Sequence, residues 1–271
     1  MDLIQAIGQT DLVAQWQRQI KEGQARQLLT GLAGSAKTLA LVSAYENFKR
    51  PILAVTPNLY YMNQLADDLR NVCEDVFVYP VDEVLSAEMA FASPEARIDR
   101  IHTLNAIAAE KPGIYVVPLA ALRKYLPQPE TWRNAQFRWE IGSELDLKDL
   151  PHQLVLMGYE RQQMIMKPGE FSIRGSIIDI YPLTAEYPVR IELFDVEVDA
   201  MRYFDVETQR SLGNAEAVVI TPTTELVFSA EDLAIGAASL QELLDKRLAV
   251  TKEAVDKSFL EEYFGQLQTS W

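Results

Sequence analysis

The sequence has 271 residues, of which 48% are hydrophobic and 24% are charged, and its formal net charge is −14. This composition is typical of a soluble globular protein with room for two domains. No apolar run approaches the roughly 20 residues that cross a bilayer, and the N-terminus lacks a secretory signal pattern, so we expect no membrane partner and a cytoplasmic location. The single cysteine, Cys73, fits a reducing compartment, and two distant histidines, His102 and His152, make a zinc site unexpected.

The acidic balance also bears on nucleic acids. Binding to DNA draws on clustered lysine and arginine, because these side chains neutralise the phosphates. The sequence contains no Lys/Arg run that would supply such a cluster. We therefore do not expect this chain to bind DNA by itself.

Over residues 1–124, short apolar runs alternate with helical patterns. The sequence predicts strands at residues 27–30, 51–55, 76–79 and 114–117, and helices at residues 36–48, 57–72 and 94–109. The run at 51–55 is apolar throughout, which is typical of a buried strand. Strands that are separated by helices of this length favour a parallel sheet with helices on its faces. The predicted class of this first domain is therefore α/β.

From residue 125 onward the pattern changes. The sequence predicts short strands, divided by turn residues, at 171–174, 177–181, 189–194 and 201–204. This pattern indicates a small antiparallel α+β domain, inserted at residues 125–214. Helical patterns return after about residue 222, so we predict a helical segment over residues 215–271. No closing strand follows it, which indicates a piece of a longer protein.

Residues 31–38, GLAGSAKT, follow a predicted strand and precede a predicted helix. This is the context of a phosphate-binding loop, in which backbone N–H groups at a helix start hold phosphates. Gly31, Gly34, Lys37 and Thr38 match the pattern, with lysine for the outer phosphates and the hydroxyl for magnesium. A glycine normally precedes the lysine, and here that position is Ala36. We expect its methyl group to crowd the phosphates, so we interpret the loop as degenerate. With the predicted parallel sheet, it indicates a P-loop-like domain of a degenerate RecA-like kind.

Hydrolysis of a nucleotide also needs an acidic residue at a strand end. The weak candidates are Asp82 and Glu83, which follow a short strand pattern that Pro80 interrupts. We therefore expect no catalytic residue and no metal site in this chain. Nucleotide binding through Lys37 and Thr38 remains an open alternative.

Two groups of residues carry a resemblance to a known family. The first comprises residues 29–38 and 51–57. The second contains YER at 159–161, PGEFSIRG at 168–175, IDIYP at 178–182 and VRIELFD at 189–195, with FD at 204–205. Together they resemble the module that the excision repair subunit UvrB shares with the transcription-repair coupling factors. The second group is the more specific, because many residues stand at fixed offsets. The resemblance covers most of residues 28–224.

Two features favour the coupling factors over UvrB. UvrB has an intact phosphate loop, whereas this chain has Ala36. UvrB also inserts a long tyrosine-rich hairpin that clamps DNA, whereas the corresponding interval at residues 84–94 is short and has Phe91 as its one aromatic residue. The alternative is an ATP- and DNA-binding fragment of a UvrB-like helicase.

The resemblance implies an adaptor that recruits UvrA to stalled RNA polymerase during nucleotide-excision repair. It implies that the strand-rich domain docks on UvrA through Arg161, Arg174, Tyr181 and Arg190. The alternative without a partner protein is that these arginines form ion pairs within the chain, with Glu160, Asp179 or Glu192. The resemblance further implies that this region has no cofactor, and that ATP, magnesium, RNA polymerase and double-stranded DNA bind downstream domains.

Overall fold

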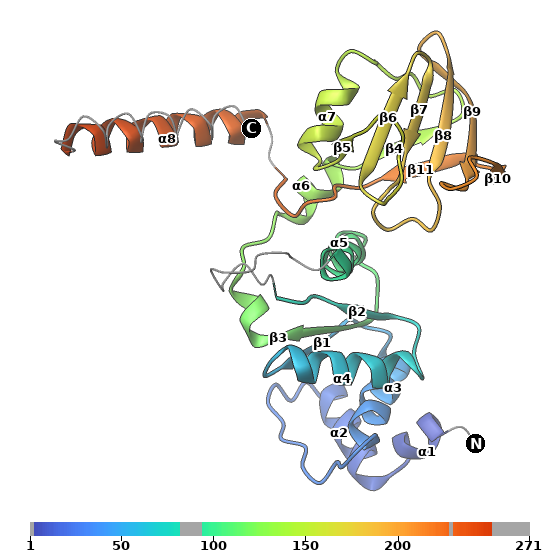
Figure 1. Cartoon of the computed structure of the whole chain (residues 1–271). Helices are drawn as coiled ribbons and strands as arrows, with labels where there is room; N and C mark the ends of the chain where they lie inside the picture. The colour runs from blue at the N-terminus through green and yellow to red at the C-terminus, as the bar shows by residue number, and fades with distance from the viewer. Residues whose placement is uncertain (1–2, 82–93, 228–229, 251–271) are drawn as a thin grey trace. The chain divides into compact units, whose positions relative to one another are not determined.

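The computed structural model describes residues 3–81, 94–227 and 230–250, and it divides the chain into two compact units, Met1–Arg133 and Asn134–Trp271 (Figure 1). In the described residues, no helix is both long and apolar enough to cross a membrane. Residues Asp82, Glu83 and most of the 84–94 interval lie outside the described residues.

The first unit contains helices and a small sheet. Its elements in chain order are α1 (Leu3–Gly8), α2 (Asp11–Lys21), α3 (Ala36–Phe48), β1 (Ile52–Thr56), α4 (Leu59–Arg70), β2 (Val76–Val78), α5 (Pro94–Ala108), β3 (Ile114–Pro118), the 3-10 helix η2 (Leu119–Arg123) and α6 (Pro129–Asn134). The helices predicted at 36–48, 57–72 and 94–109 are thereby confirmed to within two residues.

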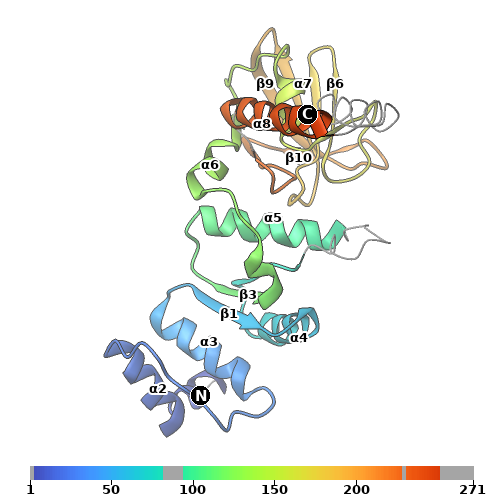
Figure 2. The same cartoon turned by 90° about the vertical axis from the view of Figure 1, so that its left-hand side faces the viewer.

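The sheet of the first unit has the strand order β1-β3-β2, and both pairings are parallel. Helices α3 and α4 cover one face and α5 lies on the other (Figures 1 and 2). The core between the sheet and α3 and α4 includes Tyr45, Met62, Leu69 and Ile114. The start of α4 is fixed by the side chain of Asn58, which accepts a hydrogen bond from the backbone N–H of Tyr61 at 3.2 Å. The parallel α/β class predicted for this region is confirmed.

Two predictions for the first unit were wrong. Residues 27–30 form no strand, and Leu28 is 88% exposed, because no strand in the described part of the chain offers these residues a hydrogen-bonding ladder. Strand β1 is not buried on both faces, since Leu53 and Val55 are 59% and 47% exposed. The reason is that β1 is an edge strand and α5 packs against β2 instead.

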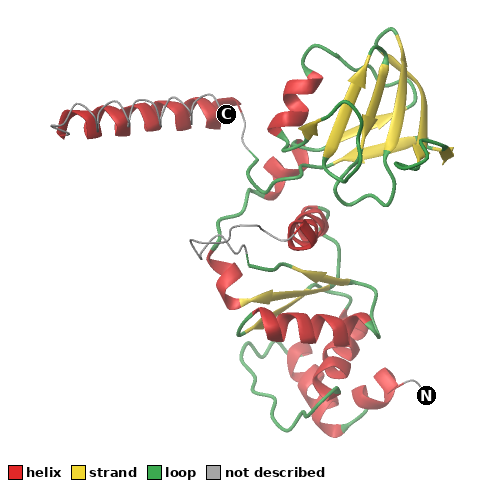
Figure 3. Ribbon diagram, in the orientation of Figure 1, coloured by secondary structure: helices red, strands yellow, loops and turns green. Residues whose placement is uncertain are grey.

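The second unit is rich in strands, which are yellow in Figure 3. Its elements are β4 (Phe137–Glu140), α7 (Leu150–Leu156), β5 (Glu160–Arg161), β6 (Glu170–Arg174), β7 (Ile177–Ile180), β8 (Val189–Phe194), β9 (Glu197–Phe204), β10 (Ser211–Asn214), β11 (Ala217–Ile220) and α8 (Ala230–Val250). The four predicted strands correspond to β6, β7, β8 and β9.

The main sheet of this unit has six strands in the order β10-β9-β8-β7-β6-β5. All its pairings are antiparallel except that of β5 with β6. A second sheet pairs β4 with β11, so β11 belongs to the antiparallel unit although it lies in the segment that was predicted to be helical from residue 215. One core joins both sheets to α7 and includes Phe171, Ile178, Ile191 and Leu154, each 0% exposed.

The core of the second unit yields a stability prediction. We expect Ile191→Ala to lower the free energy of unfolding by about 2–5 kcal/mol, because it removes three buried carbons and leaves a cavity. Ile141, which is 50% exposed, is the matched control, and Ile141→Ala should change that free energy by less than about 0.5 kcal/mol. Urea unfolding followed by circular dichroism measures both. Equal effects of the two substitutions would contradict this account of the core.

Candidate functional site

The arginine groove is a hollow of about 750 Å³ in the second unit, and it contains two of the arginines singled out in the sequence. It is lined by Arg161, Gln162, Gln163, Met164, Ser172, Ile173 and Arg174. One wall comes from β5 and the loop after it, and the other from β6. Arg161 is exposed and has no ion pair within the described residues. The groove thus combines guanidinium groups with amides and with Met164, which is 52% exposed.

The loop that forms the first wall is held by buried polar side chains of β6. The hydroxyl of Ser172, 1% exposed, donates to the carbonyl oxygen of Gln163 at 3.0 Å. The carboxylate of Glu170, 5% exposed, accepts from the backbone N–H groups of Met166 and Lys167 at 2.7 and 3.1 Å. Both contacts anchor the loop to the sheet, so the groove is formed before any partner arrives.

Asp179 of β7 joins two of the singled-out arginines. Its carboxylate is 2% exposed and accepts from Arg174 at 2.5 Å. It also accepts from Nε and a terminal nitrogen of Arg190, at 2.7 and 2.9 Å. The register explains the geometry, because Asp179 lies directly opposite Arg190 on β8 and opposite Ser172 on β6. The intramolecular pairing raised as an alternative is therefore present for both arginines.

Arg190 is enclosed more fully than Arg174. Its side chain is 22% exposed, against 48% for Arg174. The guanidinium of Arg190 lies 4.5 Å from the ring centre of Phe204 and donates to the side chain of Gln209 at 2.9 Å. Its hydrogen bonds to Asp179 raise the pKa of Arg190 above its usual value. Arg190 is thus largely engaged in the unit, whereas Arg174 presents about half of its surface to solvent.

Tyr181 does not line the arginine groove. It follows β7, and its hydroxyl donates to the carbonyl oxygen of Glu186 at 2.9 Å. Burial and the nearby Glu186 raise the pKa of Tyr181 above its usual value. The structure therefore brings Arg161 and Arg174 together, joins Arg190 to Arg174 through Asp179, and leaves Tyr181 outside. Motif reading did not single out Met164 or Gln162, because a loop between strands carries no periodic signal.

The predicted phosphate loop lies in the first unit. Gly31 and Gly34 have φ values of +85° and +55°, which favour glycine. Gly34, Lys37 and Thr38 line a groove of about 500 Å³ at the start of α3, whereas Gly31 does not line it. Of the residues that directly follow the strands, Pro57 after β1 and Leu119 after β3 are not acidic. Neither of these two positions carries a carboxylate, and the acidic candidates after β2, Asp82 and Glu83, lie outside the described residues.

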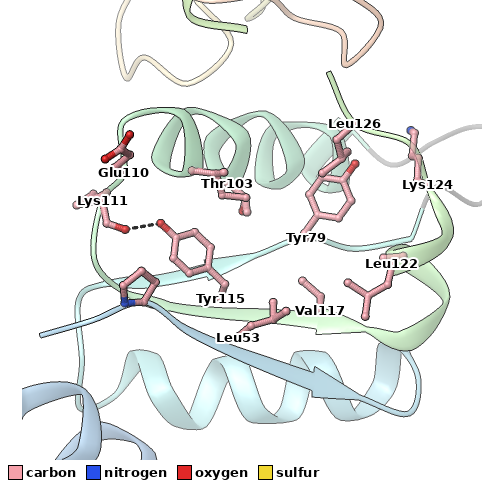
Figure 4. Close-up of a pocket in the computed structure, with 13 residues that line it drawn as sticks. Leu53, Tyr79, Thr103, Glu110, Lys111, Tyr115, Val117, Leu122, Lys124 and Leu126 are labelled. Atoms are coloured by element: carbon pink, nitrogen blue, oxygen red, sulfur yellow. Dashed lines mark hydrogen bonds between the residues drawn. The ribbon is translucent and has the colours of Figure 1, made fainter. Parts of the chain in front are cut away.

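A further hollow, of about 680 Å³, lies on the sheet face beside α5 (Figure 4). Leu53, Tyr115 and Val117 face it from the strands, and Thr103 faces it from α5. The hydroxyl of Tyr115 donates to the carbonyl oxygen of Lys111, and that of Thr103 donates to a strand carbonyl, both at 2.5 Å. Since these two hydroxyl groups are satisfied internally, the sheet side of the hollow is largely apolar, whereas Glu110, Lys111 and Lys124 add charged groups to its lining.

Comparison with known proteins agrees with the arrangement of the second unit. Residues 137–226, from the start of β4 to beyond β11, match the family model of the UvrB interaction domain. The chain is 42% identical over 234 residues to the transcription-repair-coupling factor of Bacillus subtilis (strain 168). The aligned region is 86% of this chain and 20% of that protein. It is 40% identical over 238 residues to the transcription-repair-coupling factor of Staphylococcus aureus (strain USA300). That aligned region is 87% of this chain and 20% of the relative. The chain spans about a fifth of the length of these relatives. It therefore contains a UvrB interaction domain and belongs, over the matched residues, to the family of the transcription-repair-coupling factors.

Proposed function

We propose that this chain is an adaptor module that binds UvrA and thereby recruits it to stalled RNA polymerase during nucleotide-excision repair in the cytoplasm. The observation that carries the proposal is the position of the arginine groove, which lies entirely within the residues that match the UvrB interaction domain. UvrA as the partner comes from the resemblance to UvrB and the coupling factors. Binding of RNA polymerase, double-stranded DNA, ATP and magnesium is assigned to other parts of a longer protein.

The chemistry of the arginine groove suits a protein partner with carboxylates. Arginine offers a planar fork that matches a carboxylate, and arginine is enriched among the residues that dominate interface energies. Arg161 and Arg174 stand on opposite walls, and Met164 adds apolar surface between polar neighbours. On a chain of net charge −14, such a local positive patch favours the orientation of an acidic partner surface.

Within this proposal, Arg190 and Asp179 act through Arg174. A buried carboxylate without partners is costly, so Asp179 requires both guanidinium groups. The carboxylate of Asp179 holds the side chain of Arg174 in one orientation. The Arg174 side chain therefore loses less conformational entropy when a partner binds. Arg174 keeps 48% of its side chain exposed and remains available to a partner. Tyr181 is proposed as a contact at the margin of the same surface, on the family resemblance.

We propose further that the first unit is a degenerate, RecA-like P-loop domain that hydrolyses no nucleotide by itself. The described strand ends at Pro57 and Leu119 support the absence of hydrolysis, because neither carries a carboxylate. The ATP- and DNA-binding alternative finds no specific support, since the overall charge opposes DNA binding.

The arginine groove yields the direct test of UvrA binding. We expect Arg161→Ala and Arg174→Ala each to weaken the affinity of the chain for UvrA about tenfold or more, because each removes a charge-assisted hydrogen bond. Arg138 of β4, 66% exposed and outside the groove, is the matched control, and Arg138→Ala should leave the affinity unchanged. Isothermal titration calorimetry with purified UvrA measures all three, and purified UvrB tests partner choice. If the wild-type chain binds no UvrA, the proposal fails.

The pairing of Asp179 yields a separate prediction. We expect Asp179→Asn to lower the free energy of unfolding by about 1–3 kcal/mol, because two arginines lose their charged acceptor. We also expect weaker UvrA binding at temperatures where the variant is folded, since Arg174 is no longer held. Asp199→Asn, at an exposed position of β9, is the control. Wild-type stability in Asp179→Asn, measured by urea unfolding, would show that the network does not act as described.

A further inference from the structure

Strand β5, which carries Arg161 into the arginine groove, has few hydrogen bonds of its own. It is two residues long, lies at one edge of the six-stranded sheet and, in the described part of the chain, pairs with β6 alone. The N–H of Glu160 donates to the carbonyl oxygen of Gly169 at 2.9 Å, and that of Gln162 donates to Phe171 at 2.8 Å. Strands in globular proteins are usually longer, and a strand this short gains little from its ladder. The placement of Arg161 therefore depends on what else fixes the chain around it.

The residues that face each other across this pairing carry like charges. Glu160 of β5 lies opposite Glu170 of β6. Carboxylates in directly opposed positions repel each other, which weakens the pairing of their strands. The side chain of Glu160 is 59% exposed, so water screens its charge, whereas that of Glu170 is 7% exposed. A buried carboxylate requires hydrogen-bond donors or a cation, so Glu170 depends on partners within the chain.

The loop between β5 and β6 supplies these partners. The backbone N–H groups of Met166 and Lys167 both donate to one atom, Oε2 of Glu170, at 2.7 and 3.1 Å. The ammonium group of Lys167 lies 3.9 Å from Oε1 of Glu170 and 3.3 Å from Oε2 of Glu160. We call Glu160, Lys167 and Glu170 the loop clasp. It offsets the repulsion between the two carboxylates and ties the end of the loop to both strands.

The members of the loop clasp do not contribute equally. The side chains of Lys167 and Glu160 are 63% and 59% exposed, and ion pairs between exposed side chains contribute little to stability. Hydrogen bonds to a buried charged acceptor contribute more, and the loss of that acceptor leaves its donors unpaired. The conformation of the loop therefore depends mainly on Glu170, and the ammonium group of Lys167 is secondary.

Glu170 can affect a partner only through this loop. It does not line the arginine groove, and 5% of its surface is exposed. The hydroxyl of Ser172 holds the start of the loop at Gln163, and Ile165, 1% exposed, anchors its middle. Met164 lies between these two anchors and lines the groove. Removal of the Glu170 carboxylate would thus free the end of the loop and leave its start attached.

We propose that Glu170 is a positioning residue for the UvrA-binding surface. It holds the loop after β5 so that Arg161 and Met164 stand in the arginine groove before a partner arrives, and it makes no contact with the partner itself. A loop that is ordered in advance loses less conformational entropy on binding, so the affinity is higher. This inference rests on the proposed function, because UvrA is the partner whose affinity Glu170 would raise.

Hydrogen exchange of the free chain tests the first step, which is the hold on the loop. We expect the amide protons of Met166 and Lys167 to exchange about tenfold or more faster in Glu170→Ala, and that of Ile178 in the core to exchange as in the wild type. Glu170→Gln keeps an oxygen that can accept from both N–H groups, so it should restore slow exchange. Glu140→Ala, which breaks an exposed ion pair outside the groove, is the matched control.

Calorimetric titration with purified UvrA tests the second step. We expect about tenfold lower affinity and a less favourable binding entropy in Glu170→Ala, and affinities within about threefold of the wild type in Glu170→Gln and Lys167→Ala. In the Arg161→Ala background, Glu170→Ala should lose part of its effect, because the loop then no longer positions that guanidinium group. A double-mutant cycle measures this coupling, whereas a role in stability alone would leave the two effects additive.

The outcomes separate this inference from the proposed function. If the wild-type chain binds no UvrA, the proposed function fails and the positioning role fails with it. If the wild type binds and a folded Glu170→Ala binds equally well, the positioning role alone is overturned. Should Glu170→Ala not fold, Glu170→Asp keeps the charge but withdraws the carboxylate by one methylene group. Its affinity should then be about threefold or more lower, and wild-type affinity in Glu170→Asp would equally overturn the positioning role.

Discussion

The carboxylate of Asp179, 2% exposed, is the constraint on which the face of the second unit depends. An ionised carboxylate at such a position needs charged partners, because the loss of its hydration costs several kcal/mol. Arg174 and Arg190 supply them from the two strands on either side of β7. The side chain of Arg174, which lines the arginine groove, is thus held by the carboxylate of Asp179, which the sheet buries. The sheet and the groove therefore depend on the same ion pairs.

The strands that carry this network follow from the sequence, but the network itself does not. Apolar alternation predicts β6, β7 and β8, because one face of each strand packs on the core. Which residues then stand opposite one another depends on the hairpin turns, and a shift of one residue would turn Asp179 to the other face. The sequence could therefore name Asp179 as one of three possible partners, and the register decided among them. The same argument explains why β4 and β11 were not predicted, since they pair across most of the unit.

In the first unit, helices were easier to predict than strands. Helix α3 follows from local pattern alone, because its hydrogen bonds form within the segment. Residues 27–30 are apolar enough for a strand, but a strand also requires a neighbour, and the sequence does not reveal whether one is present. The exposure of Leu53 has the same origin, since burial of β1 depends on how far α5 extends over the sheet. Local pattern thus determines which segments can form strands, and tertiary neighbours determine which segments do.

The alanine in the phosphate loop illustrates how one substitution affects two properties. Alanine favours helix over glycine by about 1 kcal/mol, so Ala36 stabilises the first turn of α3. In the described part of the chain, the N–H groups of Lys37 and Thr38 in that turn have no backbone acceptor. Hydrolysis has a different requirement, namely a carboxylate that organises magnesium and water. Ala36 thus does not prevent the start of α3 from forming, whereas the positions after β1 and β3, Pro57 and Leu119, carry no such carboxylate. The formation of the helix start and the presence of a catalytic carboxylate are therefore separate requirements.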